Sequence, residues 1–217
     1  MYKTVVFDLD GTLLNTLTDL ADAGNRLCRK YGWPTHERQA YRYFVGNGIP
    51  KLVERLAPAD QRTPAVLEAA LAEFKRDYGQ HLRDTTAPYP GIPEMLAKLK
   101  TNGVQLAVFS NKADALAKEV VKDYFGTQYF TIVRGQMTGV APKPAAEGTN
   151  ALLQALHADP ASTLYVGDSN VDVETAHNAN LPCCGAVWGF RTREELNAAG
   201  AEYLAENSDE LYDVIMK

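Results

Sequence analysis

Apolar and polar positions alternate along the chain in two ways, and each way predicts a different kind of element. Short apolar runs rich in β-branched and aromatic residues begin at residues 5, 104, 129, 163 and 185, and such runs are typical of buried strands. Apolar residues recur at helical spacing over residues 93–100, 113–124, 145–156, 171–178 and 211–216. Because these strands alternate with helices, we expect an α/β, Rossmann-like core built on a parallel sheet.

The alternation of strands and helices stops over residues 15–84, where only helices are predicted. Their expected ranges are residues 16–31, 39–45, 49–57 and 64–82, and a glycine pair around Asn47 separates the second from the third. Gly32 and Pro34 end the first helix. The chain is therefore expected to have an α/β core at 1–14 and 85–217, with an all-helical insertion at 15–84.

The composition is that of an ordinary globular protein, since 46% of the 217 residues are hydrophobic and 23% are charged. No apolar run reaches the length of a membrane span, and the first strand begins too early for a signal peptide. Three cysteines without disulfide or metal-site spacing favour a cytoplasmic protein. The net charge of −5, with scattered Lys and Arg, argues against a nucleic-acid partner. We expect a monomer or a homodimer.

Two carboxylates end the first predicted strand. Asp8 and Asp10 are one residue apart, so strand alternation directs both side chains to the same side of the chain while Leu9 enters the core. Two close carboxylates repel one another, and a hard divalent cation such as Mg²⁺ relieves that repulsion. The alternative is an ordinary Asp-Gly turn at Asp10-Gly11, to which Asp8 is incidental.

Polar residues also follow the later strands, and in a parallel sheet the residues just beyond the strand ends form the ligand site. Ser110 and Asn111 lie between a strand and a helix, where they could cradle a phosphate at the helix N-terminus or act only as a helix cap. Lys143 lies between two prolines, where its charge could neutralise a carboxylate and a phosphate, or where it could be a solvated loop residue.

The segment 167–172 follows another apolar strand and opens a helix. Asp168 and Asp172 are four residues apart, which places both on one face of a helix. Asp168 could then ligate a metal ion directly, and Asp172 could contact it through water or orient the lysine. Capping of the helix by Asp168 is the alternative interpretation.

In this order the four segments resemble the four motifs of the haloacid dehalogenase-like phosphohydrolase superfamily. The motifs are the Asp-x-Asp-x-Thr sequence at residues 8–12, the strand-end Ser110, Lys143, and the Gly-Asp-Ser-x-x-Asp sequence at residues 167–172. The resemblance covers essentially the whole chain. It implies that Asp8 is a nucleophile that forms a phosphoaspartyl intermediate, and that Asp10 is the general acid and base.

The same resemblance implies a ligand set and a phosphate site. Mg²⁺ would be held by the Asp8 carboxylate, the Asp10 backbone carbonyl and Asp168, with Asp172 behind them. The phosphate group would be held by Thr12, Ser110, Asn111 and Lys143. Lys143 would also act in catalysis.

The insertion at residues 15–84 resembles the helical cap of this superfamily, which implies that it governs substrate specificity and that residues 1–14 and 85–217 form the catalytic core. The segment Gly46-Asn47-Gly48 resembles the cap substrate loop of phosphoglycolate phosphatases, and residues 18–20 resemble the start of their cap. The resemblance implies a Mg²⁺-dependent phosphatase of small phosphorylated metabolites, with 2-phosphoglycolate as the expected substrate. A β-phosphoglucomutase, a pyrophosphatase or a non-catalytic binding or regulatory protein on the same scaffold are the alternatives.

Overall fold

The computed structural model describes residues 1–217, and the chain divides into two compact units. One unit comprises Met1–Leu14 and Pro88–Lys217, and the other comprises Asn15–Ala87. The chain passes between them at β2 (Leu14–Asn15) and β3 (Ala87–Pro88), which pair as a two-stranded sheet. The expected boundary after residue 84 thus lies close to the observed one, while the roles assigned to the two units stay predictions.

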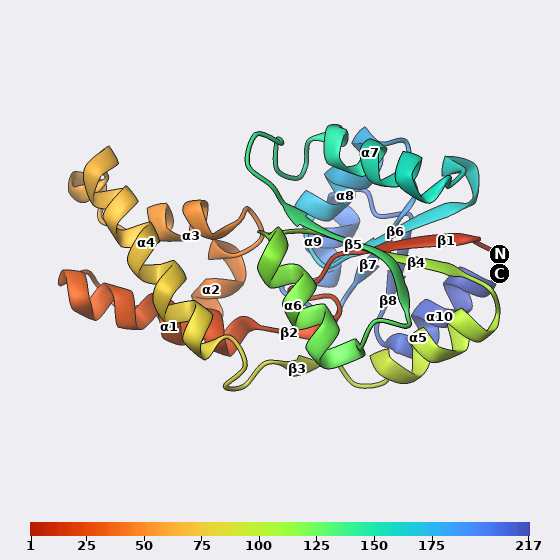
Figure 1. Ribbon diagram of the computed structural model, residues 1–217, viewed down its shortest axis with the longest axis horizontal. Helices are drawn as coiled ribbons and strands as arrows, with labels where there is room; N and C mark the ends of the chain where they lie inside the picture. The colour runs from red at the N-terminus through yellow and green to blue at the C-terminus, as the bar shows by residue number, and fades with distance from the viewer. The chain divides into compact units, whose positions relative to one another are not determined.

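A six-stranded parallel sheet forms the first unit, as the alternation of strands and helices predicts. The strands run in the order β5-β4-β1-β6-β7-β8 (Figure 1). Their bounds are β1 Thr4–Phe7, β4 Gln105–Ala113, β5 Phe130–Gln136, β6 Thr163–Gly167, β7 Cys183–Ala186 and β8 Tyr203–Ala205. All four residues of β1 are buried, because its neighbours β4 and β6 pair with it on both sides. The predicted α/β, Rossmann-like fold class is confirmed.

Helices cover both faces of this sheet. On one face lie α5 (Ile92–Thr101), α6 (Asp114–Phe125) and α10 (Ser208–Met216), and on the other lie α7 (Ala146–Leu156), α8 (Asn170–Asn178) and α9 (Arg193–Ala198) (Figure 1). The apolar side chains of α7, α8 and α9 pack with those of the sheet in one buried cluster. Apolar burial on both faces explains why the strands read as continuous hydrophobic runs.

The structure differs from the sequence-based assignment in several places. Helix α9 and strand β8 were not predicted, because both are short and β8 leaves one of its three side chains exposed. Cys183 and Cys184 lie inside β7 and not before it. Strand β4 continues to Ala113 instead of ending at Phe109, with an irregular register against β5 over its last residues.

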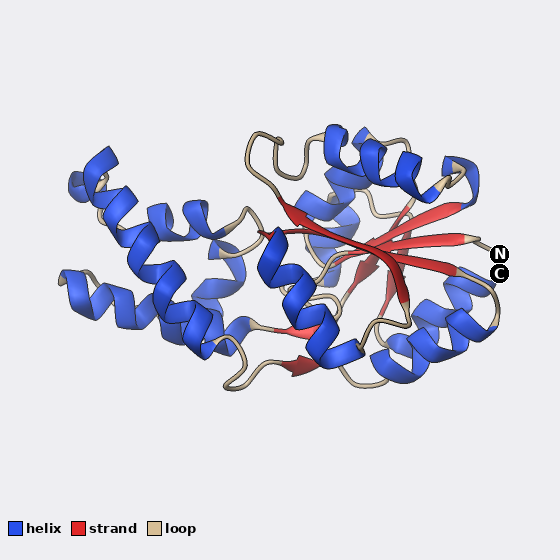
Figure 2. Cartoon of the chain, viewed as in Figure 1, coloured by secondary structure: helices blue, strands red, loops and turns tan.

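The second unit consists mainly of helices, which are drawn in blue in Figure 2. They are α1 (Leu17–Tyr31), α2 (Arg38–Phe44), α3 (Ile49–Leu56), a short 3₁₀ turn (Ala59–Gln61) and α4 (Pro64–His81). Gly32 ends α1 in the left-handed conformation, as its position in the sequence predicts. The all-helical insertion is therefore confirmed as secondary structure. A membrane-spanning helix is absent, because each helix is too short or too polar to traverse a bilayer.

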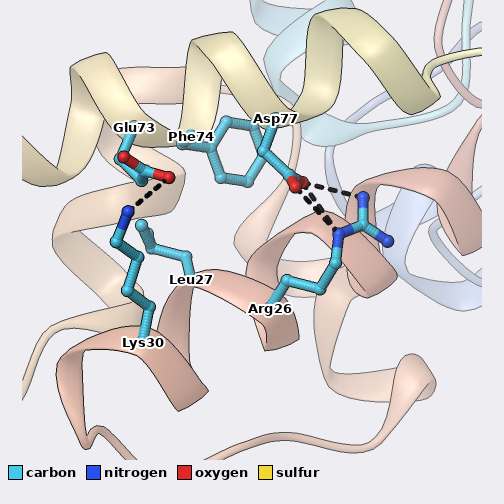
Figure 3. A pocket seen from close by; sticks show the side chains of 6 residues that line it. All are labelled: Arg26, Leu27, Lys30, Glu73, Phe74 and Asp77. Carbon is cyan, nitrogen blue, oxygen red and sulfur yellow. Dashed lines mark hydrogen bonds and ion pairs between the residues drawn. The ribbon is translucent and has the colours of Figure 1, made fainter.

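Helices α1 and α4 are joined by two ion pairs on either side of an apolar contact (Figure 3). Arg26 of α1 reaches Asp77 of α4 at 2.8 Å, and Lys30 of α1 reaches Glu73 at 2.7 Å. The side chains of Leu27 and Phe74 lie between the pairs and line the same shallow pocket. Each pair is partly exposed, so the apolar contact contributes most of the stability at this junction.

Asp19 joins the first turn of α1 to the segment that returns from α4. Its buried carboxylate accepts hydrogen bonds from the backbone N–H of Thr85 at 2.9 Å and of Thr86 at 2.9 Å. The hydroxyls of the same two threonines donate to it at 2.5 and 2.7 Å. Each of these four hydrogen bonds is charge-assisted, because the acceptor is a carboxylate. Asp19 therefore fixes the two ends of the helical unit to one another.

Replacing Asp19 by alanine is expected to destabilise the protein by about 2 kcal/mol or more, because the Thr85 and Thr86 N–H groups lose a charged acceptor. Asp22, exposed on the same helix, supplies the matched control. Asp22→Ala should change the free energy of unfolding by less than about 0.5 kcal/mol. Urea denaturation followed by far-UV circular dichroism measures both values. Equal effects of the two substitutions would contradict this role of Asp19.

Candidate active site

The predicted site residues of the core collect at one edge of the sheet. Strand β1 lies between β4 and β6, and the three strands run parallel, so the residues that follow β1 and β6 and those that end β4 come together. Asp8 continues the ladder of β1 by donating its backbone N–H to the carbonyl of Val166 at 2.8 Å. This is the edge at which ligands bind to open parallel sheets.

Lys143 joins two of the predicted carboxylates. Its ammonium lies 2.8 Å from Asp8 Oδ1 and 2.7 Å from Asp172 Oδ1, and all three residues are buried. The backbone carbonyl of Phe109 and the hydroxyl of Tyr165 lie at 3.4 and 3.3 Å from the same nitrogen. The sequence left open whether Lys143 is a solvated loop residue, and its burial rules that alternative out.

Asp168 follows β6 and is held by donors on both of its oxygens. The Thr12 hydroxyl donates to Oδ1 at 2.9 Å, and the backbone N–H of Phe190 donates to Oδ2 at 2.7 Å. Two glycines leave room for this carboxylate, because a Cβ on Gly11 would lie 2.3 Å from Oδ2 and one on Gly189 would lie 2.2 Å from its Cβ. The Asp168 side chain is therefore fixed in one position.

Asp8, Asp168 and Asp172 form a buried group of carboxylates that fits a divalent metal ion. One oxygen of each lies within 4.8 Å of the others. Asp8 Oδ1 also faces the Lys143 ammonium at 2.8 Å. Buried carboxylate oxygens are the hard donors that Mg²⁺ prefers. The Asp10 carboxylate lies outside this group. The role of the Asp10 backbone carbonyl as a metal ligand stays a prediction.

The pKa values in the cluster show the repulsion that a cation would relieve. Burial, together with the charge of Asp172, raises the pKa of Asp8 to about 7 against the lowering effect of Lys143. Burial, followed by the charges of Asp172 and Asp8, likewise raises the pKa of Asp168 well above its usual value. Burial alone would lower the pKa of Lys143, but the Asp172 and Asp8 carboxylates raise it well above its usual value. Lys143 is therefore an ammonium.

Ser110 and Asn111 reach the site in a way that differs from the expectation. Both lie within β4, and α6 begins only at Asp114, so the expected placement at a helix N-terminus is wrong. The Asn111 side chain accepts the Lys143 N–H at 2.8 Å and donates to the Lys143 carbonyl at 3.2 Å. Asn111 thus holds the backbone of Lys143, and its assignment to phosphate binding stays a prediction, as do those of Ser110 and Thr12.

Asp168 and Asp172 do not share a helical face, contrary to their spacing in the sequence. Asp168 precedes α8, which begins at Asn170 with Ser169 as its N-cap. Asp172 Oδ2 accepts from the N–H of Ser169 at 3.1 Å, as the side chain at this position does in a capping box, and it also accepts from the Ser169 hydroxyl at 2.6 Å. The two carboxylates still converge, because the chain turns sharply at Ser169.

Lys112 and Tyr165 are two residues of the site that the sequence did not single out. The Lys112 ammonium donates to Asp10 Oδ1 at 3.0 Å, and Lys112 is buried. A lysine directly after an apolar strand and the Ser110-Asn111 pair was the available signal. In the sequence, Tyr165 looks like an ordinary aromatic residue of the core, and no motif indicates that its hydroxyl lies near Lys143.

The predicted cap loop, Gly46-Asn47-Gly48, lies between α2 and α3 in the helical unit. Arg55 of α3 donates to Asn47 Oδ1 at 2.8 Å and to the carbonyl of Phe44 at 2.7 Å. Gly46 and Gly48 both have positive φ angles, of 114° and 83°, which only glycine adopts without strain. The loop therefore has a defined conformation, and its contact with substrate stays a prediction.

Gly189→Ala should weaken binding of a divalent cation about tenfold or more, because the new methyl group displaces Asp168. Gly79 is the matched control, since a Cβ there meets open space and neither glycine has a positive φ. The dissociation constant for Mn²⁺, measured by electron paramagnetic resonance of the free ion, compares the two variants. Unchanged Mn²⁺ affinity in Gly189→Ala would refute the proposed position of the metal.

Comparison with known proteins identifies the family of this chain. Residues 5–186 match the model of the haloacid dehalogenase-like hydrolases. A phosphoglycolate phosphatase of Chromobacterium violaceum is 31% identical over 98% of this chain and 96% of its own length, and one of Vibrio parahaemolyticus is 28% identical over the same shares.

Solved structures agree with this. A candidate phosphoglycolate phosphatase from Lactobacillus delbrueckii subsp. bulgaricus superposes with a TM-score of 0.93 at 28% identity, covering 99% of this chain and 98% of that one. Both the sequence and the fold therefore match over nearly the whole chain. The protein belongs to the haloacid dehalogenase-like hydrolase family.

Proposed function

We propose that this protein is a Mg²⁺-dependent phosphatase that hydrolyses 2-phosphoglycolate through a phosphoaspartyl intermediate on Asp8. Its family and its relatives make it a phosphoric monoester hydrolase. The observation that carries the proposal is the buried Asp8, whose carboxylate lies 2.8 Å from the Lys143 ammonium and beside Asp168 and Asp172. This arrangement suits a nucleophile that must approach a phosphate dianion.

In the first half-reaction, a carboxylate oxygen of Asp8 attacks phosphorus, and the bond from phosphorus to the alkoxide oxygen breaks. Asp10, as a carboxylic acid, gives its proton to that leaving oxygen. Lys143 offsets the negative charge of Asp8 and of the phosphate, which lowers the electrostatic barrier to bringing two anions together. The products of this step are the free alcohol and a phosphoryl group on Asp8.

In the second half-reaction, Asp10, now a carboxylate, takes a proton from a water molecule that attacks the same phosphorus. The bond between phosphorus and Asp8 breaks, and inorganic phosphate leaves. Asp172 keeps Lys143 in place during both steps, because it pairs with the ammonium at 2.7 Å. Asn111 fixes the backbone of the same lysine.

Asp8, Asp168 and the backbone carbonyl of Asp10 would hold Mg²⁺, with Asp172 behind them. When bound, the ion supplies positive charge that neutralises the phosphate oxygens and the carboxylates. The convergence of the Asp8, Asp168 and Asp172 carboxylates, with oxygens within 4.8 Å of one another, supports this assignment. Thr12, Ser110 and Asn111 are the proposed phosphate-binding residues, and of these Thr12 also orients Asp168.

The substrate is proposed from the relatives and from the cap loop. The curated relatives from Vibrio parahaemolyticus and Chromobacterium violaceum are phosphoglycolate phosphatases. In this chain the loop Gly46-Asn47-Gly48 has a defined conformation, because Arg55 donates to Asn47 Oδ1 and to the carbonyl of Phe44. We propose that this loop selects the small glycolate group.

Phosphate release from a panel of phosphate compounds tests the substrate and the metal together. We expect kcat/KM for 2-phosphoglycolate above about 10⁴ M⁻¹s⁻¹ and well above the values for pyrophosphate, β-glucose 1-phosphate and p-nitrophenyl phosphate. EDTA should abolish the activity, and excess Mg²⁺ should restore it. A stronger reaction with another compound would replace 2-phosphoglycolate as the substrate, and activity in EDTA would refute the metal requirement.

Asp8→Asn is expected to lower kcat by more than about 10³-fold, because an amide cannot attack phosphorus. Exposed Asp213 in α10 supplies the control variant Asp213→Asn, which should keep the wild-type rate. The wild-type protein, quenched in acid during turnover of ³²P-labelled substrate, should carry label that Asp8→Asn lacks. Turnover by Asp8→Asn near the wild-type rate would exclude Asp8 as the nucleophile.

A further inference from the structure

A second buried lysine lies in the active site, and it pairs with Asp10. Lys112 Nζ donates to Asp10 Oδ1 at 3.0 Å and lies 3.4 Å from Oδ2, so the ammonium faces both oxygens of the carboxylate. The Lys112 side chain is 2% exposed, whereas that of Asp10 is 15% exposed. The lysine is thus the fixed partner, and the aspartate is the one that faces the open side of the site.

The backbone of β4 directs Lys112 to this position. Ser110, Asn111 and Lys112 are polar residues that lie buried near the end of this strand. The register of β4 against β5 is irregular between Phe109 and Ala113, and the Lys112 N–H donates to Ser110 Oγ at 3.3 Å. Such irregularities bend a strand and redirect a side chain, and they are common beside active sites.

The burial of Lys112 makes its ion pair costly to lose. An ammonium that leaves water pays a large desolvation penalty, which a well-placed carboxylate offsets. The removal of Asp10 would leave the buried Lys112 ammonium without compensation, so the ammonium holds the Asp10 carboxyl group in one orientation. A long, flexible lysine on the surface would not do so, because an exposed pair contributes little.

We propose that Lys112 is a positioning residue for Asp10, which keeps the carboxyl group oriented to give its proton to the leaving oxygen. This inference rests on the proposed function, in which Asp10 is the general acid. The proton passes from Asp10 to the alkoxide as the bond between phosphorus and oxygen breaks, and Lys112 itself neither gains nor loses a proton. The rate of the phosphorylation half-reaction should therefore depend strongly on Lys112 when the leaving group must be protonated. It should depend only weakly on Lys112 when the leaving group departs as a stable anion.

A comparison of two leaving groups isolates this role. Glycolate is a poor leaving group that needs a proton, whereas p-nitrophenolate leaves without one, and kcat/KM reports only the steps through departure of the leaving group. Lys112→Met should lower kcat/KM for 2-phosphoglycolate about tenfold or more and that for p-nitrophenyl phosphate less than about threefold. If the panel identifies another alkyl phosphate as the best substrate, that compound replaces 2-phosphoglycolate.

The ratio of the two kcat/KM values is the measured quantity, because any loss of folded enzyme lowers both values equally and cancels. Lys112→Arg keeps the charge and should recover most of the ratio. The matched control is Lys118→Met, since Lys118 forms an exposed pair with Asp114 at 2.7 Å. Lys118→Met should leave the ratio unchanged.

The same ratio in Asp10→Asn separates the inference from the proposed function. Asp10→Asn should reduce the ratio at least as much as Lys112→Met, and the double variant should reduce it no further. If Asp10→Asn reduces the ratio but Lys112→Met does not, or if the two reductions multiply, the positioning role is wrong and the proposed function stands. If Asp10→Asn leaves the ratio unchanged, the acid role of Asp10 is wrong, and the inference about Lys112 fails with it.

Discussion

Repulsion among buried carboxylates is the constraint on which the rest of this structure depends. Asp8, Asp168 and Asp172 bring oxygens within 4.8 Å of one another at the edge of a buried sheet, where water cannot screen them. The structure offsets their charge with the Lys143 ammonium, which pairs with two of them. One ammonium cannot balance three carboxylates. The remaining negative charge is what makes this edge of the sheet suited to a divalent cation and, through it, to a phosphate.

The fold holds these charges together by leaving no freedom in the backbone around them. Strand β1 is buried between two parallel neighbours, so Asp8 has one position relative to Asp168. Gly11 and Gly189 allow the chain to pass Asp168 at distances that exclude a side chain. Asp172 is fixed by the capping box of α8. Packing of apolar residues on both faces of the sheet therefore stabilises an arrangement of charges that would repel one another in isolation.

The sequence predicted the parts of this site that depend on strand order and failed where local backbone geometry decides. Buried strands are marked by apolar runs, and the residues at their ends, such as Asp8 and Asp168, follow from the rule for parallel sheets. The irregular end of β4 is not visible in the sequence, because the Ser110-Asn111 pair is equally compatible with a helix cap. For the same reason Lys112 was overlooked. Short elements such as β8 were missed because three residues carry too little periodicity.

The end of β4 connects the two lysines of the site and explains why its geometry matters. Asn111 holds the backbone of Lys143 through two hydrogen bonds, and the next residue, Lys112, pairs with Asp10. In the proposed mechanism, Lys143 serves the nucleophile and Lys112 serves the acid, so one short segment fixes the groups on both sides of the phosphorus atom. In that mechanism a single strand end therefore helps to position both the nucleophile that attacks phosphorus and the acid that protonates the leaving group.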